Sequence, residues 1–170
     1  MRYEHGEVDL SDSPEIEIGK LLRQRKLKLG LAESCTGGLV GHRVTNVPGS
    51  SEYFTGGVVA YAYEAKVAML GVSWDTLNTY GAVSRETVLE MARGVRDLLA
   101  VDISVSVSGI AGPGGGTAEK PVGTTWIGLA APEGEWARKF IFDGDREQNK
   151  TFSADEALRM LWEYLTGNLK

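Results

Sequence analysis

Two glycine-rich segments, each placed directly after a short apolar run, most constrain how this chain folds. They are Ala32–Gly38 (AESCTGG) and Ser108–Gly116 (SGIAGPGGG). Glycine adopts a positive φ without strain and lets a ligand approach the main chain closely. A Gly-Gly pair that opens a helix also presents unpaired N–H groups, which favour an anion. The pattern therefore predicts strand ends that carry a phosphate- or oxyanion-binding turn.

Strands and helices alternate along the chain, and this order predicts the fold class. The last two strands are separated by Pro132–Glu135, a spacing typical of an antiparallel hairpin. Residues 101–108 alternate apolar and polar side chains, which predicts a strand with one polar face. We expect an α/β fold, a three-layer α/β/α domain with a mixed central sheet. Strands are expected at 29–34, 57–61, 101–108, 122–131 and 136–142, and helices from 14 onward and at 37–46, 65–70, 84–99 and 154–165.

Length and composition limit the class of protein. A chain of 170 residues is expected to form one domain, here residues 14–170 after a loose polar arm at residues 1–13. The net charge of −5 argues against nucleic acid as a partner, which requires clustered Lys and Arg. The sequence shows neither an apolar span long enough for a membrane nor a signal peptide. We expect a cytoplasmic protein.

Several catalytic chemistries fit the residues poorly. Two histidines are too few for an ordinary metal site, so neither a metal nor another cofactor is expected. Cys35 and His42 are seven residues apart, about 10 Å along a helix, too far for a nucleophile and its base. The remaining candidate chemistry is a serine nucleophile with Lys66 as its base. It requires that burial or a neighbouring cation lowers the pKa of the lysine. Lys66 could equally be an ordinary solvated lysine.

Ordered motifs along nearly the whole chain carry a resemblance to a known family. They include Gly81–Ser84, Gly109–Pro113 and Lys120–Gly123. The others are Ala32–Gly38, Val47–Phe54, Gly56–Tyr61 and Glu64–Lys66. Across roughly residues 14–166 the chain resembles the CinA C-terminal family, whose enzymatic members are nicotinamide mononucleotide deamidases.

The resemblance implies an amidohydrolase of pyridine nucleotide salvage in NAD metabolism. Such an enzyme converts nicotinamide mononucleotide to nicotinate mononucleotide and ammonia by a metal-independent serine–lysine mechanism. By motif, the resemblance implies Ser51 as nucleophile, Lys66 as base and Tyr61 as a hydrogen-bonding partner. It further implies that the substrate site is lined by Ser34, Thr36, Gly37, Gly38, Ser108, Gly109 and Arg146.

The chain departs from the family pattern at three places. Ala62-Tyr63 stands where the family commonly has Ser-Asn, and Ser108 where it commonly has Thr. The longer members also carry an N-terminal nucleotide-processing domain, which this sequence does not contain, so we expect the stand-alone form of the enzyme. Two alternatives to the deamidase stay open: a non-catalytic nucleotide-binding or regulatory module of the same fold, and an amidase for another substrate.

The position of Ser51 raises a geometric question. A straight strand over residues 55–61 is about 20 Å long at ~3.3 Å per residue. Ser51 and Lys66 then meet only if the loop folds back or if neighbouring subunits supply them. We expect a homo-oligomer, most simply a dimer, that binds a small nucleotide and neither nucleic acid nor a membrane.

Overall fold

The computed structural model describes residues 13–170, and the arm expected at residues 1–13 lies almost wholly outside that range. The described strands form one five-stranded sheet in the order β2-β1-β3-β4-β5. β1 runs parallel to β2 and β3, whereas β3–β4 and β4–β5 are antiparallel. This confirms the mixed sheet and the hairpin. The strands are β1 (Leu29–Glu33), β2 (Phe54–Val59), β3 (Ile103–Gly109), β4 (Thr124–Ala131) and β5 (Gly134–Ile141).

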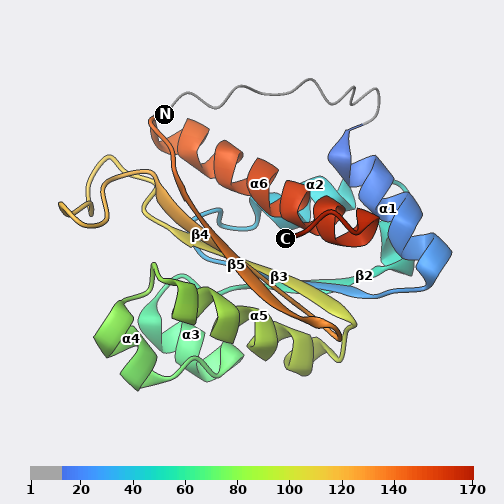
Figure 1. The fold of residues 1–170 in the computed structure, drawn as a ribbon, viewed down its shortest axis with the longest axis horizontal. Coiled ribbons are helices and arrows are strands. Elements are labelled where there is room, and N and C mark those ends of the chain that lie inside the picture. Colours follow the sequence, from blue (N-terminus) through green and yellow to red (C-terminus); the bar gives the residue numbers. More distant parts are fainter. Residues whose placement is uncertain (1–12) are drawn as a thin grey trace.

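Helices cover both faces of the sheet and confirm the three-layer architecture (Figure 1). One face carries α1 (Pro14–Arg25), α2 (Leu39–Thr45) and α6 (Arg146–Thr166), and the other carries α3 (Tyr63–Leu70), α4 (Trp74–Tyr80) and α5 (Arg85–Leu99). A short 3₁₀ helix, η1 (Ser50–Glu52), precedes β2. Within residues 13–170, no helix is long and apolar enough to span a membrane.

Most element boundaries agree with the sequence prediction within about two residues, and the larger differences concern α4, α6 and β2. α4 was not predicted, because its seven residues carry little apolar periodicity. α6 begins at Arg146 rather than 154, because Asp145 and Gln148 form a capping box ahead of the apolar stretch. β2 covers Phe54–Val59 rather than 57–61, so the chain leaves the sheet before Tyr61.

The polar face of β3 is buried against α5. Ser104 Oγ donates to Ala92 O at 2.6 Å, and Ser106 Oγ donates to Val88 O at 2.5 Å. Both serines are fully buried. A Cβ on Gly128 of β4 would lie 2.7 Å from Val88 O, so this glycine also permits the close approach. Alternation of polar residues here marks contact with a helix backbone rather than with solvent.

The carboxyl ends of β2, β1 and β3 meet at one edge of the sheet, because these three strands are parallel. Successive side chains on a strand point to opposite faces. Leu31 of β1 packs in the core beneath α1, α2 and α6, and Ala32 packs in the core beneath α3 and α5. By the same alternation, Glu33 faces α2 and Ser34 faces α3.

Candidate active site

Lys66 on α3 is buried at the carboxyl edge of the sheet, with 1% of its surface exposed. Its Nζ lies 2.8 Å from Ala60 O and 3.1 Å from Tyr61 O, in the segment that leaves β2. The same Nζ lies 3.0 Å from Ser34 Oγ, directly after β1. Lys66 is therefore not a solvated helix residue. It joins the ends of two strands.

Burial lowers the pKa of Lys66 to about 8 from its ordinary value of 10.5. At pH 7 roughly a tenth of the molecules then carry a neutral amine, against less than about 0.1% at the ordinary pKa. A neutral amine has two N–H donors and one lone pair. The two carbonyls can accept both N–H groups, which leaves the lone pair for the hydroxyl proton of Ser34. The geometry suits a base directed at Ser34.

The lowered pKa of Lys66 predicts a pH-dependent stability. Between pH 8 and 10.5 the unfolded chain binds more protons at this lysine than the folded chain does, so the free energy of unfolding should rise with pH. Lys66→Met removes the titrating group. Urea denaturation from pH 7 to 10 should show wild type gaining stability relative to this variant. Parallel curves for the two proteins would show that the lysine pKa is not lowered.

The Ser34–Gly38 turn is held against the end of β3. Ser34 N donates to Val107 O at 2.9 Å, and Gly37 N donates to Ser34 O at 3.0 Å. Gly109 makes this approach possible, since a Cβ there would lie 3.1 Å from Cys35 Sγ and 2.5 Å from Thr125 Oγ1. Burial raises the pKa of the Cys35 thiol to about 11, which argues against a thiolate nucleophile.

Glu33 occupies the start of α2, where the sequence predicted an anion-binding turn. Its carboxylate accepts hydrogen bonds from Thr36 Oγ1 at 2.7 Å, Gly38 N at 3.0 Å and Gly41 N at 2.8 Å. Val40 N donates to it as well, at 3.1 Å. The turn thus already binds an internal anion. Thr36 Oγ1, Gly37 N and Gly38 N thus shape the site through hydrogen bonds made within the chain.

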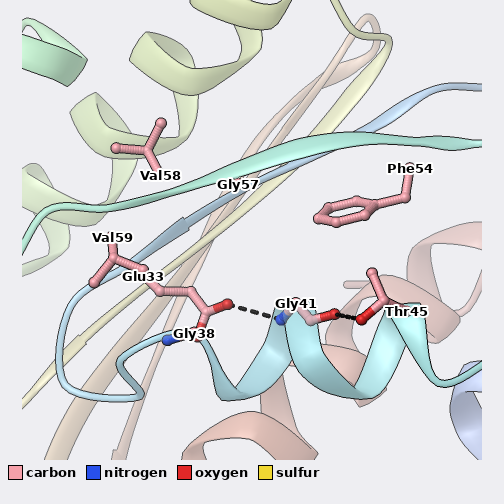
Figure 2. Close-up of a pocket in the computed structure, with 8 residues that line it drawn as sticks. All are labelled: Glu33, Gly38, Gly41, Thr45, Phe54, Gly57, Val58 and Val59. Carbon is pink, nitrogen blue, oxygen red and sulfur yellow. Dashed lines mark hydrogen bonds between the residues drawn. The ribbon is translucent and has the colours of Figure 1, made fainter. Parts of the chain in front are cut away.

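A pocket of about 220 Å³ lies between α2 and the free edge of β2 (Figure 2). Figure 2 shows the Glu33 carboxylate directed at Gly41 on α2, with Phe54 across the pocket. The pocket is separate from the Lys66–Ser34 contact, because Glu33 and Ser34 face opposite sides of the sheet. It is lined by Glu33, Gly38, Gly41, Thr45, Phe54, Gly57, Val58 and Val59.

Arg146, the first residue of α6, reaches across the site. Its Nη2 donates to Tyr61 Oη at 3.0 Å, and its Nη1 donates to Gly112 O at 2.6 Å. It thereby links the second glycine-rich segment to the part of the chain that follows β2. Tyr61 is mostly exposed, while its carbonyl accepts from Lys66. The structure brings Ser34, Tyr61, Lys66 and Arg146 together.

Two other predicted site residues make different contacts. Ser108 lies at the carboxyl end of β3, directly after the residue whose carbonyl accepts from Ser34 N. Ser108 Oγ donates to Ala82 O at 2.7 Å, so this hydroxyl fixes the loop before α5. Ser51 lies in η1, before β2, whereas Lys66 follows the other end of that strand. The six residues of β2 span about 20 Å. Within one chain, the loop does not fold back, so the pairing of Ser51 with Lys66 stays a prediction that requires a second copy.

Ala62 and Tyr63, which stand where the family commonly has Ser and Asn, differ in the contacts that they make. Tyr63 Oη accepts from Ala82 N at 3.2 Å and so connects α3 to the loop before α5. Ala62 is the N-cap of α3 but provides no side-chain hydrogen bond. The cap that a serine would provide is missing from the helix that carries Lys66.

Restoring that cap should stabilise the protein. Ala62→Ser places a hydroxyl at an N-cap whose extended backbone (φ −82°, ψ 163°) suits it. We expect about 1 kcal/mol of added stability, measured by chemical denaturation. Ala62→Val, which cannot accept a hydrogen bond, is the control. Equal or lower stability of the serine variant than of wild type would contradict this assignment.

Sequence reasoning missed Glu33 and Lys150. An acid at the end of a buried strand, directly before a Gly-Gly helix start, was the available signal for Glu33. Lys150 Nζ lies 4.0 Å from the place where a Cβ on Gly37 would stand, a proximity with no sequence signal. No group of three or more His, Cys, Asp or Glu side chains within residues 13–170 is arranged to hold a metal ion.

Comparison with known proteins places the chain in a family. The CinA C-terminal domain profile matches residues 11–165. The chain is 52% identical over 169 residues to a putative competence-damage inducible protein of Halothermothrix orenii, covering 99% of this chain and 40% of the relative. It is 52% identical over 150 residues to a CinA-like protein of Thermotoga maritima, covering 88% of this chain and 36% of the relative. The chain thus spans well under half the length of these relatives.

Solved structures of other proteins have the same fold as this chain. A CinA superfamily protein from Klebsiella pneumoniae matches with a TM-score of 0.87 and 32% identity, covering 91% of this chain and 96% of that one. The competence/damage inducible protein CihA from Agrobacterium tumefaciens matches with a TM-score of 0.83 and 38% identity, covering 91% and 97%. The architecture is therefore shared over nearly the whole length of both structures.

Proposed function

The chain belongs to the CinA C-terminal domain family, and we propose that it hydrolyses the carboxamide of nicotinamide mononucleotide to nicotinate mononucleotide and ammonia. The observation that carries the proposal is the contact of Lys66 Nζ with Ser34 Oγ at 3.0 Å, at a lysine whose pKa burial lowers to about 8. Amide hydrolysis needs a nucleophile and a base that later returns the proton to the leaving nitrogen. The pair supplies both.

In the first step, neutral Lys66 accepts the hydroxyl proton of Ser34 as Ser34 Oγ attacks the carboxamide carbon. A C–O bond forms, and the carbonyl oxygen takes the negative charge of the tetrahedral intermediate. Collapse of that intermediate breaks the C–N bond, and the Lys66 ammonium gives its proton to the leaving nitrogen. Ammonia departs, and an ester between Ser34 and the nicotinoyl group remains.

In the second step, a water molecule hydrolyses this ester. Lys66, neutral again, accepts a proton from the water as its oxygen attacks the ester carbon. As the ester bond breaks, Lys66 returns the proton to Ser34 Oγ, and the carboxylic acid product leaves and loses its remaining proton to solvent. Ala60 O and Tyr61 O hold Lys66 in place through both steps, because both lie within hydrogen-bond distance of Nζ.

Ser34 is the proposed nucleophile because it reaches the base within one chain. The resemblance to the family points instead to Ser51, which precedes β2, whereas Lys66 follows the other end of this strand of about 20 Å. A homodimer that brings Ser51 of a second copy to Lys66 is the arrangement that this alternative needs. β2 is an edge strand of the sheet, so its outer backbone is open to such a copy.

Release of ammonia tests the function. Purified protein should release ammonia from nicotinamide mononucleotide and form nicotinate mononucleotide in equal amounts. Nicotinamide and nicotinamide riboside, which lack the phosphate, should be poor substrates. Binding of the mononucleotide without ammonia release would identify a non-catalytic module instead. Faster release from a carboxamide without a phosphate would identify an amidase for another substrate.

A further inference from the structure

The pocket between α2 and β2 contains a buried carboxylate that no cation neutralises. Glu33, which is 3% exposed, lines this pocket of about 220 Å³. Within residues 13–170, no Lys, Arg or His side chain lies within ion-pair distance of it. A carboxylate has about four acceptor positions. Glu33 Oε2 accepts three hydrogen bonds, whereas Oε1 accepts only that of Gly41 N, so Oε1 keeps a position for a further donor.

The open edge of β2 adds backbone groups to the same pocket. Ala60 N donates to Glu33 O, and by the alternation along the strand Val58 faces β1 as well. The residues between and before them, Val59 and Gly57, then direct their N–H and C=O groups to the free side of this edge strand. Both residues line the pocket. A ligand there meets main-chain donors and acceptors beside the carboxylate.

The opposite wall is apolar and aromatic. Figure 2 shows the Phe54 ring across the pocket from Glu33. Two glycines leave room in front of this ring, because a Cβ on Gly41 would lie 3.8 Å and one on Gly57 3.7 Å from Phe54 Cζ. The pocket is smaller than those that hold drug-sized molecules, so its volume suits a single ring.

We propose that this pocket binds a planar ring that carries an amidinium-type cation, at a site separate from the proposed active site. The N–H groups of the ligand donate to Glu33 Oε1 and to an open carbonyl of β2, while its ring packs against Phe54. Its positive charge compensates the buried carboxylate, which is the one ionisable group among the eight described residues that line the pocket. Binding here does not require the proposed hydrolysis.

Benzamidine is the probe, because it joins a phenyl ring to an amidinium group. It should raise the melting temperature of the wild-type chain in a saturable manner at constant ionic strength. Benzamide has nearly the same shape without the charge and should bind at least about tenfold more weakly. N-acetylarginine amide carries a planar cation without the ring and should also bind about tenfold more weakly. Equal binding of either compound would contradict the proposed ligand class.

Two glycine substitutions test the location of the site. Gly41→Ala puts a methyl group 3.4 Å from Glu33 Oε1, and Gly57→Ala puts one 3.7 Å from Phe54 Cζ. Neither methyl group meets a neighbour closer than ordinary van der Waals contact, and alanine favours the helix at position 41, so both variants should fold. Each should weaken benzamidine binding about tenfold or more, because each methyl group occupies the pocket.

Gly56→Ala is the matched control. It lies on the same strand, but its Cβ would point to the opposite face, 3.8 Å from Leu99 Cδ1 of α5. It should bind benzamidine as wild type does. The proposal is wrong if benzamidine does not stabilise wild type, if Gly41→Ala and Gly57→Ala bind it normally, or if Gly56→Ala loses binding to the same extent. Circular dichroism of the three variants checks that each is folded.

Discussion

Replacing Lys66 with Met should lower kcat for nicotinamide mononucleotide by about 10²- to 10⁴-fold, the range that general-base catalysis supplies. Methionine fills a similar volume in the buried position, so the protein should remain folded. Ammonia release measures the loss, and circular dichroism checks the fold. Lys139→Met, at an exposed position on β5, is the control and should behave as wild type.

A second substitution tests whether Lys66 acts as a base or only as a positioned cation. Lys66→Arg keeps a positive charge with hydrogen-bond donors but cannot be deprotonated near neutral pH. It should be about as inactive as Lys66→Met. In wild type, kcat should rise with pH and level off above about 8, because only the neutral lysine accepts the proton. Full activity of the arginine variant would remove Lys66 from the role of base.

Replacing Ser34 with Ala should be at least as damaging as replacing Lys66, with kcat reduced by roughly 10³-fold or more. The variant loses the atom that attacks the carboxamide, while the turn keeps its main-chain bonds to Val107 and Gly37. Ser51→Ala changes an exposed residue in η1 and should stay within about twofold of wild type. Steady-state kinetics of both variants decide between the two serines.

Mixing of subunits tests the competing arrangement. If Ser51 of one copy acts with Lys66 of another, a mixture of Ser51→Ala and Lys66→Met chains should regain activity through hybrid dimers. With Ser34 and Lys66 acting in the same chain, the mixture should show only the sum of its two components. Recovered activity in this experiment would transfer the nucleophile to Ser51.

The fold was predictable because local sequence patterns determine where its strands, helices and hairpin turn lie. Alternating apolar runs and helix signals gave the layers, and the short turn at Pro132–Glu135 gave the β4–β5 hairpin. The sequence pattern did not predict the surroundings of a residue where two environments give the same pattern. Ser104 and Ser106 have the alternation of a solvent-facing strand, yet they donate to carbonyls of α5.

The site was predictable only in part, because contacts across the sheet leave little trace in sequence. The resemblance to the family singled out Lys66, Tyr61 and Arg146, which the structure brings together with Ser34. Which serine faces the lysine depends on where each lies along the parallel strands, and sequence spacing does not settle this. The binding of the α2 amides by Glu33 likewise depends on the three-dimensional turn.

The most direct measurement is the location of the acyl group on the enzyme during turnover. Wild-type protein is mixed with nicotinamide mononucleotide, quenched in acid, digested with trypsin and analysed by mass spectrometry. Trypsin separates the two serines, since cleavage after Lys28, Arg43 and Lys66 yields peptides 29–43 and 44–66. We predict the nicotinoyl mononucleotide ester on peptide 29–43, located to Ser34 by fragmentation. The same added mass on Ser51 in peptide 44–66 would contradict the assignment of Ser34 as the nucleophile.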